Sequence, residues 1–132
     1  MKKLLSAISL ILFGIPANAE LASVYACQYT RSSGFYFEEG QWNSVSFVVR
    51  EPFFLKTDGE KITSVGDLAP EFMSCTISNI YRYHQCGDQF GNTVFFNPGN
   101  LRGGASYLNG ATSDSEDHRD DVFVEMFICE AM

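Results

Sequence analysis

The densest group of ionisable residues lies near the C-terminal end, in Asp114-Ser115-Glu116-Asp117-His118-Arg119-Asp120-Asp121. Its five carboxylates are of the type that Ca²⁺ takes as ligands. The segment has neither the glycine nor the ligand spacing of an EF-hand, so we favour a solvated run of charge and keep a calcium site as the alternative. We assign no metal ion and no other cofactor.

The other polar residues do not form a recognisable catalytic motif. A nucleophile needs a base beside it, and the only histidines are His84 and His118, with no Gly-x-Ser-x-Gly segment to serve. Glu38 and Glu39 are paired carboxylates, as glycoside hydrolysis requires, but neighbouring residues on a strand point to opposite faces. We therefore predict a protein that is not an enzyme and has no catalytic residues.

The four cysteines are spaced too widely for a Cys-x-x-Cys zinc pair. An even number in a small exported chain is typical of disulfides, and three pairings are open. We favour Cys75–Cys86, which closes a local loop, with Cys27–Cys129, which joins the first and last strands.

The first 19 residues have the features of a secretory signal: Lys2 and Lys3, an apolar run, and small residues up to Ala19. Cleavage there leaves one domain, residues 20–132, in the periplasm or secreted, with no membrane anchor. It also lowers Lys+Arg from nine to seven against sixteen Asp+Glu, giving a formal charge of −9. Such an acidic surface repels nucleic acid and suits solubility or a basic protein partner. We expect a monomer.

Short apolar stretches separated by Gly, Pro, Asn and Asp predict a mainly β chain, with one or two short helical turns, one of them over 62–68. Phe35–Phe37, a four-residue turn over 38–41 and the stretch from Trp42 predict a hairpin with Phe37 opposite Trp42. The fold class is a small antiparallel β-barrel or sandwich with two disulfides. Further strands are expected at 23–30, 53–55, 72–80, 93–96 and 122–129.

Aromatic and glycine residues add two expectations. We expect Phe35, Tyr36, Phe37, Trp42, Tyr81 and Tyr83 to belong to the core, with an exposed contact patch as the alternative. Gly99-Asn100-Leu101-Arg102-Gly103-Gly104 is expected to form a turn with positive φ angles, because it lacks the Lys-Ser/Thr of a phosphate loop.

Several short patterns resemble those of a group of small, exported, uncharacterised bacterial proteins. They are Tyr25-x-Cys27, Phe37-Glu38-x-Gly40-x-Trp42, Pro52-Phe53-Phe54-Leu55, Phe95-Phe96-Asn97-Pro98, and Arg119-Asp120-x-Val122 with Phe127-x-Cys129-Glu130-x-Met132. This resemblance implies no activity. A weaker one links Tyr25-Ala26-Cys27 and Ser33-Gly34-Phe35-Tyr36 to periplasmic inhibitors of c-type lysozyme, and it implies a small acidic β-barrel.

The leading functional hypothesis is an exported, non-enzymatic domain that binds or inhibits a cationic protein such as a lysozyme. Electrostatic attraction would speed encounter and a few aromatic side chains would hold the complex. The alternative is an envelope protein with a structural or stress role that binds a small ligand or calcium. The residues expected to bind are Glu38, Glu39, Trp42, Asp117, Asp120 and Asp121.

Overall fold

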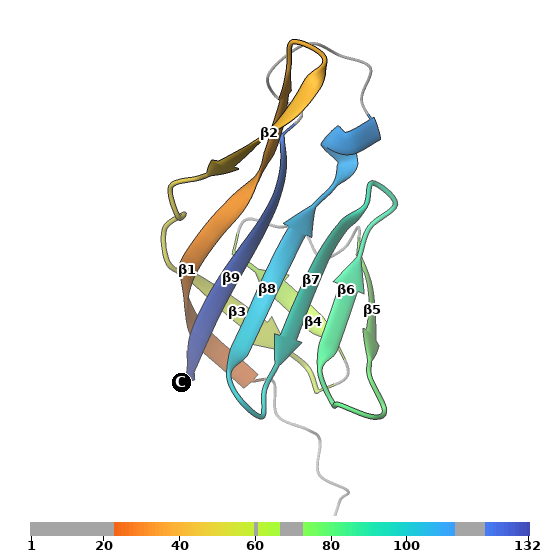
Figure 1. Cartoon of the computed structure of the whole chain (residues 1–132). Coiled ribbons are helices and arrows are strands. Elements are labelled where there is room, and N and C mark those ends of the chain that lie inside the picture. Colours follow the sequence, from red (N-terminus) through yellow and green to blue (C-terminus); the bar gives the residue numbers. More distant parts are fainter. Residues whose placement is uncertain (1–22, 60, 67–72, 113–120) are drawn as a thin grey trace, which may run out of the picture.

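The protein forms a nearly closed antiparallel β-barrel (Figure 1). The computed structural model describes residues 23–59, 61–66, 73–112 and 121–132. Two disulfides cross-link the barrel, so the fold class expected from the sequence is confirmed. The strands are β1 (Ser23–Glu38), β2 (Gln41–Ser46), β3 (Phe53–Thr57), β4 (Ile62–Val65), β5 (Ser74–Ile77), β6 (His84–Gly87), β7 (Asn92–Asn97), β8 (Arg102–Tyr107) and β9 (Val122–Ala131).

The strands form one sheet in the order β4-β3-β1-β9-β8-β7-β6-β5, and β2 pairs with the second half of β1. The sheet curls until its two edge strands approach each other, and the Cys75 sulfur on β5 lies 3.6 Å from the Ile62 carbonyl oxygen on β4. Strand β9 lies between β1 and β8, as its apolar sequence predicts for a central strand.

A bulge in β1 determines which residues of this long strand face the core. Tyr29 lies opposite Phe127 and Arg31 opposite Met126, so Thr30 is an extra residue. Its hydroxyl donates a hydrogen bond of 3.1 Å to the Met126 carbonyl oxygen. Odd-numbered residues face inward before the bulge and even-numbered residues after it.

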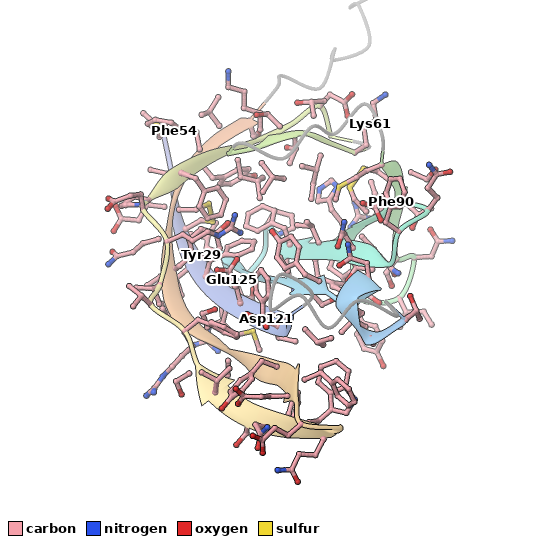
Figure 2. All side chains as sticks on the ribbon, turned by 90° about the horizontal axis from the view of Figure 1, so that it is seen from above. Tyr29, Phe54, Lys61, Phe90, Asp121 and Glu125 are labelled. Carbon is pink, nitrogen blue, oxygen red and sulfur yellow. A yellow bond between two sulfur atoms is a disulfide. The ribbon has the colours of Figure 1, made fainter. Side chains whose placement is uncertain are left out.

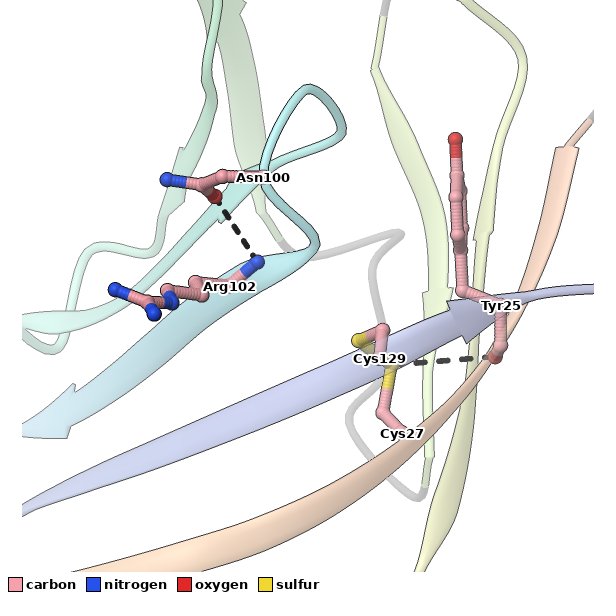
Figure 3. Close-up of a disulfide and its surroundings, with 5 residues drawn as sticks. All are labelled: Tyr25, Cys27, Asn100, Arg102 and Cys129. Carbon is pink, nitrogen blue, oxygen red and sulfur yellow. Dashed lines mark hydrogen bonds between the residues drawn. A yellow bond between two sulfur atoms is a disulfide. The ribbon is translucent and has the colours of Figure 1, made fainter.

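The buried core is built from the inward-facing side chains of β1, β3, β4, β6, β7, β8 and β9, and Cys75 of β5 packs against it. Phe96 and Leu55 are completely buried, and Phe127 packs edge-on against Phe53 with ring centroids 5.2 Å apart. The disulfides Cys27–Cys129 and Cys75–Cys86 each join residues directly opposite each other on paired strands, which confirms the favoured pairing. Figure 3 shows the first of them between β1 and β9.

Two local expectations need correction. Residues 62–65 form strand β4, not a helical turn, and residues 67–68 lie outside the described residues; within the described part of the chain, a 3₁₀ turn occurs at Asn109–Thr112. The turn expected in 99–104 is present over 98–101, but its positive φ angle, 59°, belongs to Leu101, and Gly103 and Gly104 lie inside strand β8. Asn100 accepts the Arg102 backbone N–H at 3.1 Å and so starts β8 directly after the turn (Figure 3).

Candidate functional site

A two-stranded arm, residues 33–46, projects beyond one end of the barrel (Figures 1 and 2). It consists of the end of β1 and the whole of β2, paired from Ser33↔Ser46 to Glu38↔Gln41. The turn therefore has two residues, Glu39 and Gly40, where the sequence suggested four. Their φ angles of 51° and 78° are those that a tight type I′ hairpin turn requires.

The arm presents its aromatic residues to solvent. Phe35, Phe37 and Trp42 are 49%, 43% and 44% exposed, so the expectation that they lie in the core is wrong. The reason is the Thr30 bulge, which places odd-numbered β1 residues on the outer face of the arm. Phe37 and Trp42 lie opposite each other with ring centroids 5.2 Å apart, so the predicted cross-strand pair is confirmed.

Acidic residues lie near this aromatic pair along the chain. Glu38 and Glu39 are exposed at the tip of the arm, next to Phe37 in sequence. Asp121 directly precedes β9, whose first residue, Val122, lies opposite Phe35. The structure therefore brings four of the six expected binding residues, Glu38, Glu39, Trp42 and Asp121, to one end of the molecule. Asp117 and Asp120 lie outside the described residues.

The arm returns to the barrel through residues 47–52, which are anchored by a polar cluster that the sequence analysis did not identify. Arg50 reaches across Tyr29 of β1 to Glu125 of β9. Figure 2 shows the side chains of Tyr29 and Glu125 at the barrel interior. Arg50 Nε donates to Glu125 Oε1 at 3.0 Å, and its Nη2 donates to the other carboxylate oxygen. The same Nη2 donates to the hydroxyls of Tyr29 and Tyr107, each at 2.8 Å.

We name these four residues the arginine cluster: Arg50, Glu125, Tyr29 and Tyr107. Glu125 is only 1% exposed, whereas 43% of the Arg50 side chain is exposed. The Arg50 guanidinium also lies 4.7 Å from the Tyr29 ring centroid, within the range of a cation–π interaction. The cluster thus satisfies a buried carboxylate and fixes the chain at the base of the arm.

Burial changes the proton affinities within the arginine cluster. It raises the pKa of Tyr29 to about 12 and raises the pKa of Tyr107 as well. Burial opposes the charge of Arg50, but the hydrogen bond with Glu125 and the neighbouring oxygens outweigh it, and the pKa of Arg50 rises. The phenols therefore stay protonated and the guanidinium stays charged at neutral pH, which suits a structural anchor.

Other polar residues do not combine with the arm. His84 is 5% exposed and stacks near Phe96 inside the barrel, and His118 lies outside the described residues. Across the described ranges, His, Cys, Asp and Glu never gather in threes in a way that could hold a metal ion. Tyr81, 70% exposed, stacks with Tyr83 with ring centroids 6.4 Å apart, so it also lies outside the core.

Comparison with protein-family models, with curated proteins and with solved structures found no match to this chain. The resemblances noted in the sequence therefore stay predictions. A separate observation concerns membranes: within the described residues, no helix has the length and apolar character needed to cross a bilayer.

Proposed function

We propose that this chain is an exported, non-enzymatic binding domain whose arm binds a basic protein. The observation that carries the proposal is the exposed Phe37–Trp42 pair beside Glu38 and Glu39 on a projecting hairpin. Aromatic side chains dominate the energy of many protein interfaces, and a surface charge of matching sign accelerates encounter. The arm combines both properties at one tip.

Export to the periplasm or the medium agrees with the covalent structure. Every cysteine is in a disulfide, and such bonds form and persist in oxidising compartments. A c-type lysozyme is a suitable partner because it is a basic protein that an exported protein can meet outside the cytoplasm. The resemblance to lysozyme inhibitors, carried by the Tyr25-Ala26-Cys27 strand, supports the barrel architecture more than the choice of partner.

The test measures binding of the oxidised mature domain to a c-type lysozyme by calorimetry at low and high salt. Replacing Glu38 and Glu39 by Lys is expected to weaken binding at least about tenfold, equal to about 1.4 kcal/mol, and to reduce its salt dependence. The matched control is Glu51→Lys with Glu130→Lys, which makes the same charge change at exposed positions outside the arm. This control is expected to retain most of the affinity.

Trp42→Ala separates the two contributions. It is expected to weaken binding by a similar factor while leaving the salt dependence unchanged, because it removes an aromatic contact and no charge. Absence of binding by the unaltered domain would refute a lysozyme partner. Equal losses for the arm variant and the control would refute the role of the arm.

A further inference from the structure

The outer face of β7, β8 and β9 carries an apolar groove of about 680 Å³, a volume within the range of small-ligand sites. Its centre is Gly104, which lies opposite Phe95 on one side and Met126 on the other in the strand register. A Cβ atom at Gly104 would come 3.1 Å from the Met126 sulfur. The missing side chain therefore opens a slot between two walls, about one strand spacing or about 4.8 Å wide, which matches a single hydrocarbon chain.

The walls of the groove are apolar side chains that solvent reaches. On β9, Val124, Met126 and Ile128 are 44%, 53% and 51% exposed, and all three face outward. On β7, Phe95 is 38% exposed, and the Tyr83 ring packs against it with ring centroids 5.8 Å apart. Contiguous exposed apolar side chains are typical of binding grooves and contact sites.

Hydrogen-bond donors gather at one end of the groove. Arg102, two residues before Gly104 on the same face of β8, lines the groove together with Asn100. Figure 3 shows the Arg102 guanidinium and the Asn100 amide extending in the same direction. Among the described residues, Arg102 is the only charged member of the lining and forms no ion pair. An anionic group at this end would therefore gain a cation without displacing an existing partner.

The floor of the groove offers no backbone partner to an occupant. Strand β8 pairs with β7 on one side and with β9 on the other, so the backbone N–H and C=O groups around Gly104 are used within the sheet. A polypeptide segment laid in the groove would leave its own backbone groups unpaired against apolar walls, which is costly. A hydrocarbon chain carries no such groups. The groove thus favours a ligand with an apolar chain over a protein segment.

We infer that the groove binds one molecule of an anionic amphiphile with a single hydrocarbon chain. The hydrocarbon chain lies over Gly104 between the two walls, and the anionic group meets the donors of Arg102 and Asn100. A free amphiphile fits better than a membrane surface, because the protein carries a formal net charge of −7, which anionic lipid surfaces repel. The groove shares no residue with the arm, so this site is independent of the proposed basic partner.

Calorimetric titration of the oxidised mature domain with octanoate, below its micelle concentration, tests the proposal. Saturable one-to-one binding is expected, and octanol, which has the same chain length without the charge, should bind about tenfold more weakly. Arg102→Gln should lower the affinity for octanoate to that for octanol and leave octanol binding unchanged. The matched control is Lys56→Gln, which removes the same charge at an exposed position on β3 outside the groove and should change neither affinity.

A second variant tests the apolar walls. Met126→Glu should abolish the binding of octanoate, because it places a carboxylate beside the ligand, whereas Phe54→Glu on β3, at a residue 55% exposed, should leave it intact. Far-ultraviolet circular dichroism confirms that each variant folds, and Arg102→Gln still decides the matter if Met126→Glu does not.

Three results would overturn the proposal. They are no saturable binding of octanoate, an octanoate affinity unchanged by Arg102→Gln or by a folded Met126→Glu variant, and association with phosphatidylglycerol vesicles in place of octanoate binding. Lysozyme binding is measured separately, so the failure of either proposal leaves the other standing.

Discussion

Glu125 carries its carboxylate into the barrel interior and depends on Arg50 for its charge balance. A buried carboxylate that loses its cation is strongly destabilising, whereas replacing both members of a buried pair by apolar residues is often neutral. The arginine cluster therefore predicts non-additive effects of substitution.

Arg50→Met alone is expected to lower the free energy of unfolding by about 3 kcal/mol, the lower end for buried pairs because solvent reaches Arg50. Arg50→Met with Glu125→Met should recover most of that loss. Urea unfolding of the two single variants and the double variant measures the coupling. Additive losses would mean that the pair contributes no interaction energy of its own.

For individual residues, the sequence predicted exposed side chains better than buried polar partners. The exposure of Glu38 and Glu39 could be predicted because residues of a tight turn are exposed to solvent whatever the rest of the fold. Arg50 could not, because its partners lie 21 to 75 residues away and meet only in the closed barrel. One signal was available: Glu125 is a lone carboxylate in the apolar stretch 122–129, and a buried charge requires a partner.

The arm is held at its root by an unusually close contact between β1 and β9. A Cβ atom at Gly34 would lie 1.9 Å from the Val122 carbonyl oxygen and 2.6 Å from the Phe123 Cα atom. Both are backbone atoms, so relief requires one strand to move. Gly34 thus allows β1 to continue from the barrel into the arm.

Gly34→Ala is expected to displace the arm and to lower the free energy of unfolding by about 2 kcal/mol, as is usual for overpacking. Gly87→Ala is the matched control, since its nearest atoms would lie 3.6 Å away, an ordinary contact distance. Near-ultraviolet circular dichroism of Trp42 and thermal melting would report the two effects. Unchanged spectra and stability for Gly34→Ala would refute this account of the root.

Strands with a clear alternation could be predicted, and those shaped by bulges or glycine could not. The faces of β5 and the Phe37–Trp42 pairing followed from period-two patterns. Strand β4 was not predicted because its two apolar residues, Ile62 and Val65, are three residues apart, which is a helical spacing. The register between β3 and β4 shifts between Lys56 and Thr57, and this shift brings Ile62 and Val65 to the same, buried face.

For the molecule as a whole, the two disulfides differ in how much of the chain they constrain. Cys27–Cys129 spans 102 residues and joins the two ends of the barrel sequence, whereas Cys75–Cys86 spans 11. In the chain-entropy model the long loop is worth about 4.7 kcal/mol and the short one about 3 kcal/mol.

Replacing both cysteines of the long loop by Ala is therefore expected to cost more than the same change in the short loop. Chemical unfolding of the two double variants makes the comparison. Because each variant loses two buried or half-buried sulfur atoms, the loss of packing is similar in both. A larger loss for the Cys75–Cys86 variant would indicate that strain or denatured-state structure outweighs loop length.

The bulge at Thr30 makes this point of the gene tolerant of a deletion. Loss of this one codon would let β1 pair with β9 in uninterrupted register, and Arg31 would still lie opposite Met126, so every later side chain of β1 would keep its side. Phe35 and Phe37 would stay exposed to solvent and Ser32 would stay buried. A deletion of three nucleotides would thus remove the bulge and preserve the faces of the arm.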